Sequence, residues 1–286
     1  MAAWLLQLPV IGLQRDQLMH LHLSRNLLLA ALWLLSSGGA LAAPVPLALS
    51  ITGTVALDGA SSAAALGGAT QDGTLRHLSA GVPTSSSFTG NPAGLLPSSL
   101  SGALTATGDG IGVRFAMAGA SIDAENDIGL VADYTLFLSN GSAVETFTIV
   151  FRALISNVVG ASGIDAFAFA DLSVLDASST EVLFSDHRID TLDPVNNLNA
   201  DSASDIFSVV LAPGASTTFT ALQRQRGGVY ATGHFSASLD AFLRVDSVSS
   251  SGSGNAVPLP GSLALVVLGL AGLAGLAPAR RRTHAG

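Results

Sequence analysis

The sequence predicts an all-β protein: an antiparallel β-sandwich, jelly-roll or immunoglobulin-like, flanked by an N-terminal signal peptide and a single C-terminal transmembrane sorting helix. Three observations lead to this prediction. Apolar and polar residues alternate through the middle of the chain, a first apolar run lies near the N-terminus, and a second lies close to the C-terminus, before three arginines. A period of two is that of a strand with one buried face. No convincing amphipathic helix competes with it.

The N-terminal segment has the order of a secretory signal. Arg25 precedes the apolar run 27–35, and small residues follow. This order predicts that residues 1–43 are a signal peptide, handled by the Sec translocon and signal peptidase. The stretch before Arg25 is long for a positive n-region, so Met19 is an alternative start. The cleavage signal consists of Ala40, Ala42 and Ala43, with the cut after Ala42 or Ala43.

Residues 44–246 are predicted to form the β-sandwich body. Apolar residues fall on alternate positions over 45–57 and again over 229–245. The second run is too long for one typical strand, so we expect two strands or one strand bent near Gly233. Further strands are expected at 111–117, 130–139, 144–151, 166–174, 206–211 and 217–222.

Two turn signals separate these strands. Asn140-Gly141 predicts a hairpin between its flanking strands, because both residues tolerate positive φ. Pro213-Gly214 suits the two central positions of a type II turn. Two other segments lack strand periodicity: we expect long loops with at most one weak strand at 59–102, and a flexible Ser/Gly linker at 247–256.

The C-terminal segment 257–286 has three parts in a fixed order. An extended motif comes first, then the apolar run 263–277 and a basic stop. A helix from residue 263 to residue 279 would span roughly 25 Å, short for a bilayer core of about 30 Å. The arginines favour the cytoplasmic side, which leaves the body outside. The motif is Val257, Pro258, Leu259 and Pro260, and the stop is Arg280, Arg281 and Arg282.

This tail resembles the PEP-CTERM sorting domains of Gram-negative bacteria, in the variant whose motif is Val-Pro-Leu-Pro. The resemblance covers about thirty residues, and Leu259 stands where glutamate is usual. It implies that an exosortase processes the chain near Val257–Pro260 and that the helix holds the precursor in the inner membrane transiently. It also implies an association with exopolysaccharide and biofilm.

Composition excludes several classes of function. The chain has 20 Asp and Glu against 12 basic residues, a formal net charge of −8, and no lysine. An acidic protein of this kind is a poor nucleic-acid binder. It also contains no cysteine, which excludes disulfide scaffolds, thiolate catalysis and cysteine metal sites.

Asp123, Glu125 and Asp127 are weak calcium candidates, because oxygen ligands recur at alternate positions as at the start of an EF-hand loop. The pattern then fails, with Ile128 and Tyr134 where glycine and glutamate belong. A solvated acidic turn is the stronger interpretation. We therefore expect no cofactor, with calcium as the one alternative.

The other polar clusters point to no chemistry. We interpret Asp186–Asp190, with its single histidine and the later Asp193, Asp201 and Asp205, as a solvated loop; the alternatives are a metal held by His187 and the carboxylates, or contacts with calcium or a sugar hydroxyl. His234 lies on the polar face of its alternating run. Such a face can bind a sugar, but it is more often simply the solvent-exposed side of a sheet. Gly160–Gly163 is one residue short of a nucleophile elbow. We expect no enzyme and assign no catalytic residue.

The sequence therefore predicts an exported surface or extracellular-matrix protein, sorted by an exosortase, with a structural or interaction role. The alternative is a calcium- or glycan-binding adhesin module that an uncleaved C-terminal helix tethers to the membrane. Both tryptophans, Trp4 and Trp33, lie in the predicted leader. The scarcity of aromatic residues in the body counts against a dedicated sugar cleft.

Overall fold

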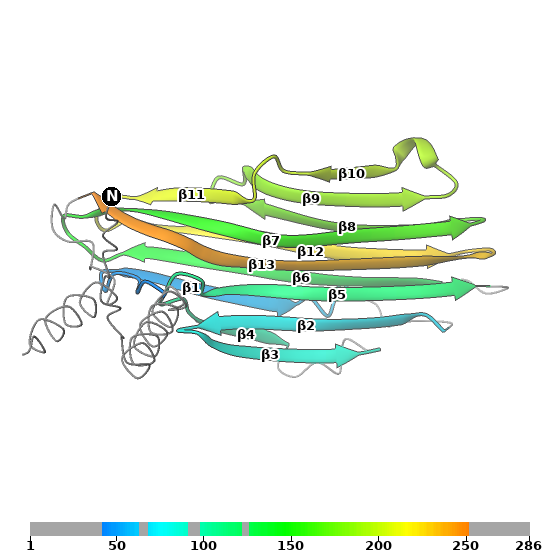
Figure 1. Ribbon diagram of the computed structural model, residues 1–286, viewed down its shortest axis with the longest axis horizontal. Helices are drawn as coiled ribbons and strands as arrows, with labels where there is room; N and C mark the ends of the chain where they lie inside the picture. Colours follow the sequence, from blue (N-terminus) through cyan, green and yellow to red (C-terminus); the bar gives the residue numbers. More distant parts are fainter. Residues whose placement is uncertain (1–41, 63–67, 91–97, 122–125, 252–286) are drawn as a thin grey trace, which may run out of the picture. The chain divides into compact units, whose positions relative to one another are not determined.

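The computed structural model describes residues 42–62, 68–90, 98–121 and 126–251, which belong to one compact unit given by Ala42–Gly254. Within these ranges the fold is all-β, with two antiparallel sheets (Figure 1). A single 3₁₀ turn, η2 (Pro194–Asn196), is the helical element among the described residues. No helix in that part of the chain is long and apolar enough to span a membrane. The predicted sorting motif, helix and arginine stop lie outside the described residues.

Seven strands form one sheet and six form the other. The seven-stranded sheet has the order β10 (Leu198–Asp201), β9 (Glu181–Asp190), β8 (Ala166–Leu175), β12 (Ser216–Val229), β6 (Asn126–Asn140), β1 (Leu49–Leu57) and β4 (Ser99–Ala103). The six-stranded sheet has the order β11 (Ile206–Leu211), β7 (Thr146–Gly163), β13 (Gly233–Ser251), β5 (Gly110–Ser121), β2 (Thr70–Ser79) and β3 (Val82–Thr89).

The two sheets pack face to face, and the alternation in the sequence provides the buried layer between them. Strand β8, for example, alternates buried and half-buried residues along its whole length. β7 packs against β8 and β9 of the opposite sheet, and β13 packs against β8 and β12. Phe151, Phe207 and Phe219 form a ring cluster in the core, with centroid distances of 5.2 Å (Phe151–Phe207) and 5.1 Å (Phe207–Phe219). Burial of these apolar side chains is the main force that holds the sheets together.

The strands predicted from alternation are present. β11 has the predicted bounds, and the predicted strands at 111–117, 130–139, 166–174 and 217–222 lie within β5, β6, β8 and β12. The predicted turn at Pro213-Gly214 is also found. Gly214 has φ +71°, and the Ala215 N–H donates to the Ala212 carbonyl at 3.0 Å. The long run at 229–245 is divided between β12 and β13, with the break at Tyr230–Thr232.

The hairpin predicted at Asn140-Gly141 is wrong. β6 and β7, which flank it, belong to different sheets. The buried Asn140 side chain explains the crossing: its Nδ2 donates to the carbonyls of Glu145 (2.7 Å), Leu211 (3.1 Å) and Ala212 (2.9 Å). An asparagine that satisfies three carbonyls supports a sheet-to-sheet crossing without a tight two-residue turn.

Two segments contain more strand than predicted, since 59–102 was expected to hold at most one weak strand and 247–256 none. The range 59–102 holds β2, β3 and the start of β4, and the linker predicted at 247–256 is strand β13 as far as Ser251. In β2 the inward positions are Gln71, Gly73, Leu75 and His77, so polar and small residues conceal the alternation. Ser247–Ser251 of β13 pair with Val150–Thr146 of β7. In both cases the main-chain pairing between strands decides the structure, and amino-acid composition does not reveal that pairing.

Candidate interaction groove

Strand β7 is much longer than the edge strand beside it. β11 pairs with Phe147–Arg152 of β7, whereas β13, on the other side, pairs with β7 as far as Gly163. Among the described residues, Ala153–Gly163 therefore has a strand neighbour on one side alone. We call this segment the open edge of β7.

The direction of the free main-chain groups follows from one hydrogen bond. The Ala153 N–H donates to the Asp205 carbonyl at 2.8 Å, on the β11 side of the strand. Main-chain groups alternate in direction along a strand, and the register with β13 is uninterrupted over the open edge. The N–H and C=O groups of Ile155, Asn157, Val159 and Ala161 consequently point away from β13.

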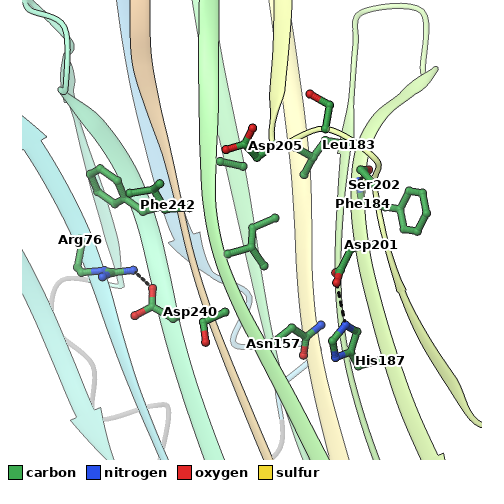
Figure 2. A pocket seen from close by; sticks show the side chains of 15 residues that line it. Arg76, Asn157, Leu183, Phe184, His187, Asp201, Ser202, Asp205, Asp240 and Phe242 are labelled. Carbon is green, nitrogen blue, oxygen red and sulfur yellow. Dashed lines mark hydrogen bonds and ion pairs between the residues drawn. The ribbon is translucent and has the colours of Figure 1, made fainter.

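An open groove of about 950 Å³ lies beside the open edge (Figure 2). One wall is Ala153–Asn157 of β7. The opposite wall comes from β9, from the end of β10 and from the segment after it, and includes His187 and Asp201. Arg76, Asp240 and Phe242 line the outer end. A smaller hollow of about 270 Å³ continues along Asn157–Val159 to Leu198 and Asn199 of β10.

Polar side chains cross the groove at its inner end. Asn157 Nδ2 donates to the Ala170 carbonyl and to Ser185 Oγ, both at 2.9 Å, and so ties β7 to the opposite sheet. His187 Nε2 lies 3.2 Å from Asp201 Oδ2 (Figure 2). Asn157 Oδ1 is buried without a hydrogen-bond partner among the described residues. The groove therefore has hydrogen-bonding capacity in its side chains as well as in its main chain.

Ion pairs occupy the rim. Arg76 pairs with Asp240. Arg152 pairs with Asp205 at 2.6 Å and with Asp246 at 3.0 Å, just before the open edge begins. The hydrogen bond from Arg152 lowers the pKa of Asp246. Both arginines are thus engaged, and with Asp201 the rim carries more carboxylates than guanidinium groups.

A second surface lies on the outer face of the seven-stranded sheet. The rings of Phe167 and Tyr230 stack at 5.8 Å between centroids, and the Arg226 guanidinium lies 5.6 Å from the Phe167 centroid. Arg188 lies 5.8 Å from the centroid of Phe169 in the same way. We call these residues, with Asp127, the outer aromatic cluster.

The calcium prediction gains nothing from the structure. Asp123 and Glu125 lie outside the described residues. Asp127 pairs with Arg226 through both carboxylate oxygens and accepts a hydrogen bond from the Tyr230 hydroxyl at 3.2 Å. Within the described ranges no group of three or more His, Asp or Glu side chains could hold a metal ion.

The polar stretch Asp186–Asp190 was predicted to be a loop. It is instead part of β9. Strand geometry separates its side chains, because successive residues point to opposite faces. His187 faces the groove, whereas Asp186 lies opposite Asp171 of β8 on the outer face. Burial is the main cause that raises the pKa of Asp171, and the nearby Asp186 charge adds to it.

His234 does lie on an exposed face, as its pattern predicts. Its cross-strand partner is Ser162, whose Oγ lies 3.1 Å from both ring nitrogens. The two residues sit on flat neighbouring strands, not on the strand-to-helix turn of a nucleophile elbow. We assign no catalytic role to this pair.

Comparisons with known proteins give no family. No family model and no curated protein matches the chain. Among solved structures, the infectious bursal disease virus Gx strain is similar over 74% of this chain at 12% identity, with a TM-score of 0.19. The VP2 subviral particle of that virus is similar over 79% of this chain at 9% identity, with a TM-score of 0.13; 73% of its chain is covered. The chain spans 57% of the Gx strain structure that it matches.

The groove as a whole was not predicted from the sequence, although three residues that line it, His187, Asp201 and Asp205, belong to the polar stretch discussed above. The walls of the groove come from five strands and from the segment after β10, so no local motif marks them. One signal was available: Ala153–Gly163 is a strand-forming stretch with no charged residue and no proline. Natural sheet edges usually carry such residues as protection, so this edge segment lacks the usual protection.

Proposed function

We propose that this chain is an exported surface or extracellular-matrix protein with a structural or interaction role linked to exopolysaccharide and biofilm. In this proposal the signal peptide directs export, the helix 263–277 holds the precursor in the membrane, and an exosortase cleaves near Val257–Pro260. The support comes from the order of the terminal segments in the sequence. The finished protein then acts outside the cell without a catalytic site or a cofactor.

The observation that carries the interaction role is the shape of the two surfaces on the body. The groove beside β7 is open along its length, and the outer aromatic cluster lies on an exposed sheet face. Open surfaces of this kind suit long polymers, whereas small-molecule sites are usually closed pockets that bury most of the ligand. The chain also passes repeatedly from one sheet to the other, which favours the jelly-roll member of the two expected sandwich classes.

A glycan-binding module tethered by an uncleaved helix is the second candidate, and the outer aromatic cluster favours it. Phe167 and Tyr230 offer ring faces, and Arg226 and Asp127 offer planar hydrogen-bonding groups beside them. Exposed ion pairs stabilise a protein by only about 0–1 kcal/mol, so sugar hydroxyls can compete for these groups. The calcium version of this candidate is weaker, because Arg226 neutralises Asp127.

Mass measurement on protein from the native host tests the proposal. Intact mass and C-terminal peptide mapping should give a chain that ends near Val257–Pro260, recovered from the medium or the matrix. A chain that still ends at Gly286 in the membrane fraction would overturn the sorting claim and leave the tethered module. Tyr230→Ala, with Tyr134→Phe as a buried control, then tests whether exopolysaccharide retention depends on the outer aromatic cluster.

A further inference from the structure

We propose that the open edge of β7, Ala153–Gly163, binds an extended, non-acidic peptide segment as an added strand in line with β11. This activity adds a protein partner to the interaction role proposed above. It concerns the folded body alone, so a binding measurement can fail while the sorting proposal holds, and the reverse.

The main chain supplies the first part of the argument. Ile155, Asn157, Val159 and Ala161 present four N–H and four C=O groups toward the groove, at the spacing of a β-ladder. An extended peptide has the same groups at the same spacing, and strand addition to a free edge is a recurrent mode of peptide recognition. This side of β7 already pairs with one strand, because β11 is hydrogen-bonded to β7 immediately before the open edge.

The other sheet edges differ from this one. Asn126–Val131 of β6 also has a single strand neighbour, β12, but it is short and carries Asp127. β3 carries Pro83 and exposed polar residues, and β4, β10 and β11 have five, four and six residues respectively. Short strands and edge prolines are the usual means by which proteins prevent unwanted pairing. The open edge has neither form of protection: it is eleven residues long and contains no proline. It is also uncharged. Its lack of protection fits a segment whose pairing is functional.

The groove admits one strand more readily than a second copy of the protein. β9, β10 and the segment after β10 form the wall opposite the open edge. A second copy that paired its own β7 edge here would bring its own β9 and β10 into the same space. A peptide strand without sheet neighbours avoids this collision. The occupant is therefore an extended segment, not another sandwich.

The walls define the side chains of the peptide. Leu154 and Val158 are 45% and 62% exposed on the outer side of the open edge, so aliphatic peptide residues should lie beside them. On the inner side the peptide meets Asn199 and the His187–Asp201 pair. Because Asp201, Asp205 and Asp240 line the groove, acidic peptides are disfavoured. The best partner alternates aliphatic with polar residues and carries basic ends.

A labelled peptide tests the proposal on the full chain in mild detergent. The probe is Lys-Thr-Val-Thr-Val-Thr-Lys with blocked ends, and its binding is measured by fluorescence anisotropy. Val159→Pro removes one main-chain donor that faces the groove and none that faces β13, so it should weaken binding at least about tenfold. Val159→Ala removes two methyl groups but keeps the donor, and should weaken binding less than about threefold.

Chemically modified peptides test the proposal on the unaltered protein, so that the result does not depend on whether Val159→Pro folds. The threonine side chains face inward, so their main-chain amides face the open edge and pair with it. N-methylation of the three threonine amides should therefore abolish binding to the unaltered protein. N-methylation of the valine amides should spare it. The same peptide with glutamate in place of both lysines should bind more weakly.

Four results would overturn the proposal. The first is the absence of saturable binding up to about 1 mM peptide. The second is equal binding by the two sets of N-methylated peptides, and the third is equal binding by Val159→Pro and Val159→Ala. The fourth is displacement of the peptide by cellohexaose, or a dimer of the free protein that the peptide dissociates; these results would make the occupant a glycan or a second copy, respectively.

Discussion

The two halves of β7 are both rich in apolar residues and have different surroundings. Thr146–Arg152 lies between β11 and β13, and its inward residues Phe147, Ile149 and Phe151 are fully buried. Ala153–Gly163 is also rich in aliphatic residues, yet it has β13 alone as a strand neighbour. The difference teaches that the course of a neighbouring strand, rather than the strand's own sequence, decides whether an apolar segment becomes core or surface.

The cause lies in the segment between β10 and β11. β10 pairs with β9 in the seven-stranded sheet, and after Ser202–Asp205 the chain enters the six-stranded sheet as β11 (Figure 1). The Ser202 hydroxyl accepts a hydrogen bond from the Phe184 N–H at 2.7 Å, which holds the start of this crossing against β9. The chain thus reaches β7 only at the level of Ala153, and the rest of the strand stays open.

The largest difference between the two halves is expected in the free energy of unfolding, when one side chain in each half is truncated. Phe151→Ala removes a fully buried ring that stacks on Phe207, and should lower the free energy of unfolding by about 3–5 kcal/mol. Leu154→Ala should lower it by no more than about 1 kcal/mol, because its side chain is 45% exposed. Urea titration measures both. Equal losses would mean that the open edge is covered in solution.

Asn157 provides a second contrast, since it holds the open half to the opposite sheet by hydrogen bonds. Asn157→Ala removes its bonds to the Ala170 carbonyl and Ser185 Oγ, and should lower the free energy of unfolding by about 1–3 kcal/mol. Ser156→Ala, at the exposed neighbouring position, is the control and should have little effect. A neutral result for Asn157→Ala would contradict the bridging role.

Arg152 marks the boundary between the halves, and its effect should depend on pH. Arg152 lowers the pKa of Asp246 below its usual value of 3.8. A carboxyl with a lowered pKa stabilises the folded state above its unfolded pKa, and this contribution is lost as pH falls through its folded pKa. Arg152→Gln should therefore be less stable than wild type at pH 7, and the difference should shrink below about pH 4. A pH-independent difference would contradict this account.

The smallest effect is expected far from the groove, at Asp171 on the outer face. Burial raises its pKa, so its charged form is disfavoured in the folded state at neutral pH, and protonation relieves this as pH falls. Asp171→Asn should stay within about 1 kcal/mol of wild type at pH 7, because it also loses the exposed pair with Arg224. Wild type should gain stability relative to the variant between pH 7 and pH 4. Thermal unfolding across this range would show the opposite trend if the assignment is wrong.

The sequence predicted the fold where side chains alternate and failed where main-chain pairing acts alone. β11 and the turn at Gly214 were predicted from local chemistry, which needs no partner to be recognised. β2 and β3 were missed because glycine, glutamine and serine occupy their inward positions. The crossing at Asn140 was missed because two of its three acceptors, the carbonyls of Leu211 and Ala212, lie far along the chain.

The candidate site was less predictable than the fold. Of the predicted calcium residues, Asp127 does not line the groove, and of the predicted loop Asp186–Asp190 only His187 lines it, whereas the open edge of β7 is marked by an absence of charge and by strand lengths. That β11 ends its pairing at Arg152 depends on where the chain changes sheets. Sequence periodicity does not encode this position, so an open edge emerges only from the three-dimensional arrangement.

Residue-resolved hydrogen exchange of the full chain in detergent tests the open edge most directly. The amides of Ile155, Asn157, Val159 and Ala161 should exchange rapidly, while those of the intervening residues, which bond to β13, should be protected. Over Phe147–Arg152 both sets should be protected, because β11 covers the other side. Uniform protection from Phe147 to Ala161 would contradict the account, since it would mean that another strand already occupies the groove.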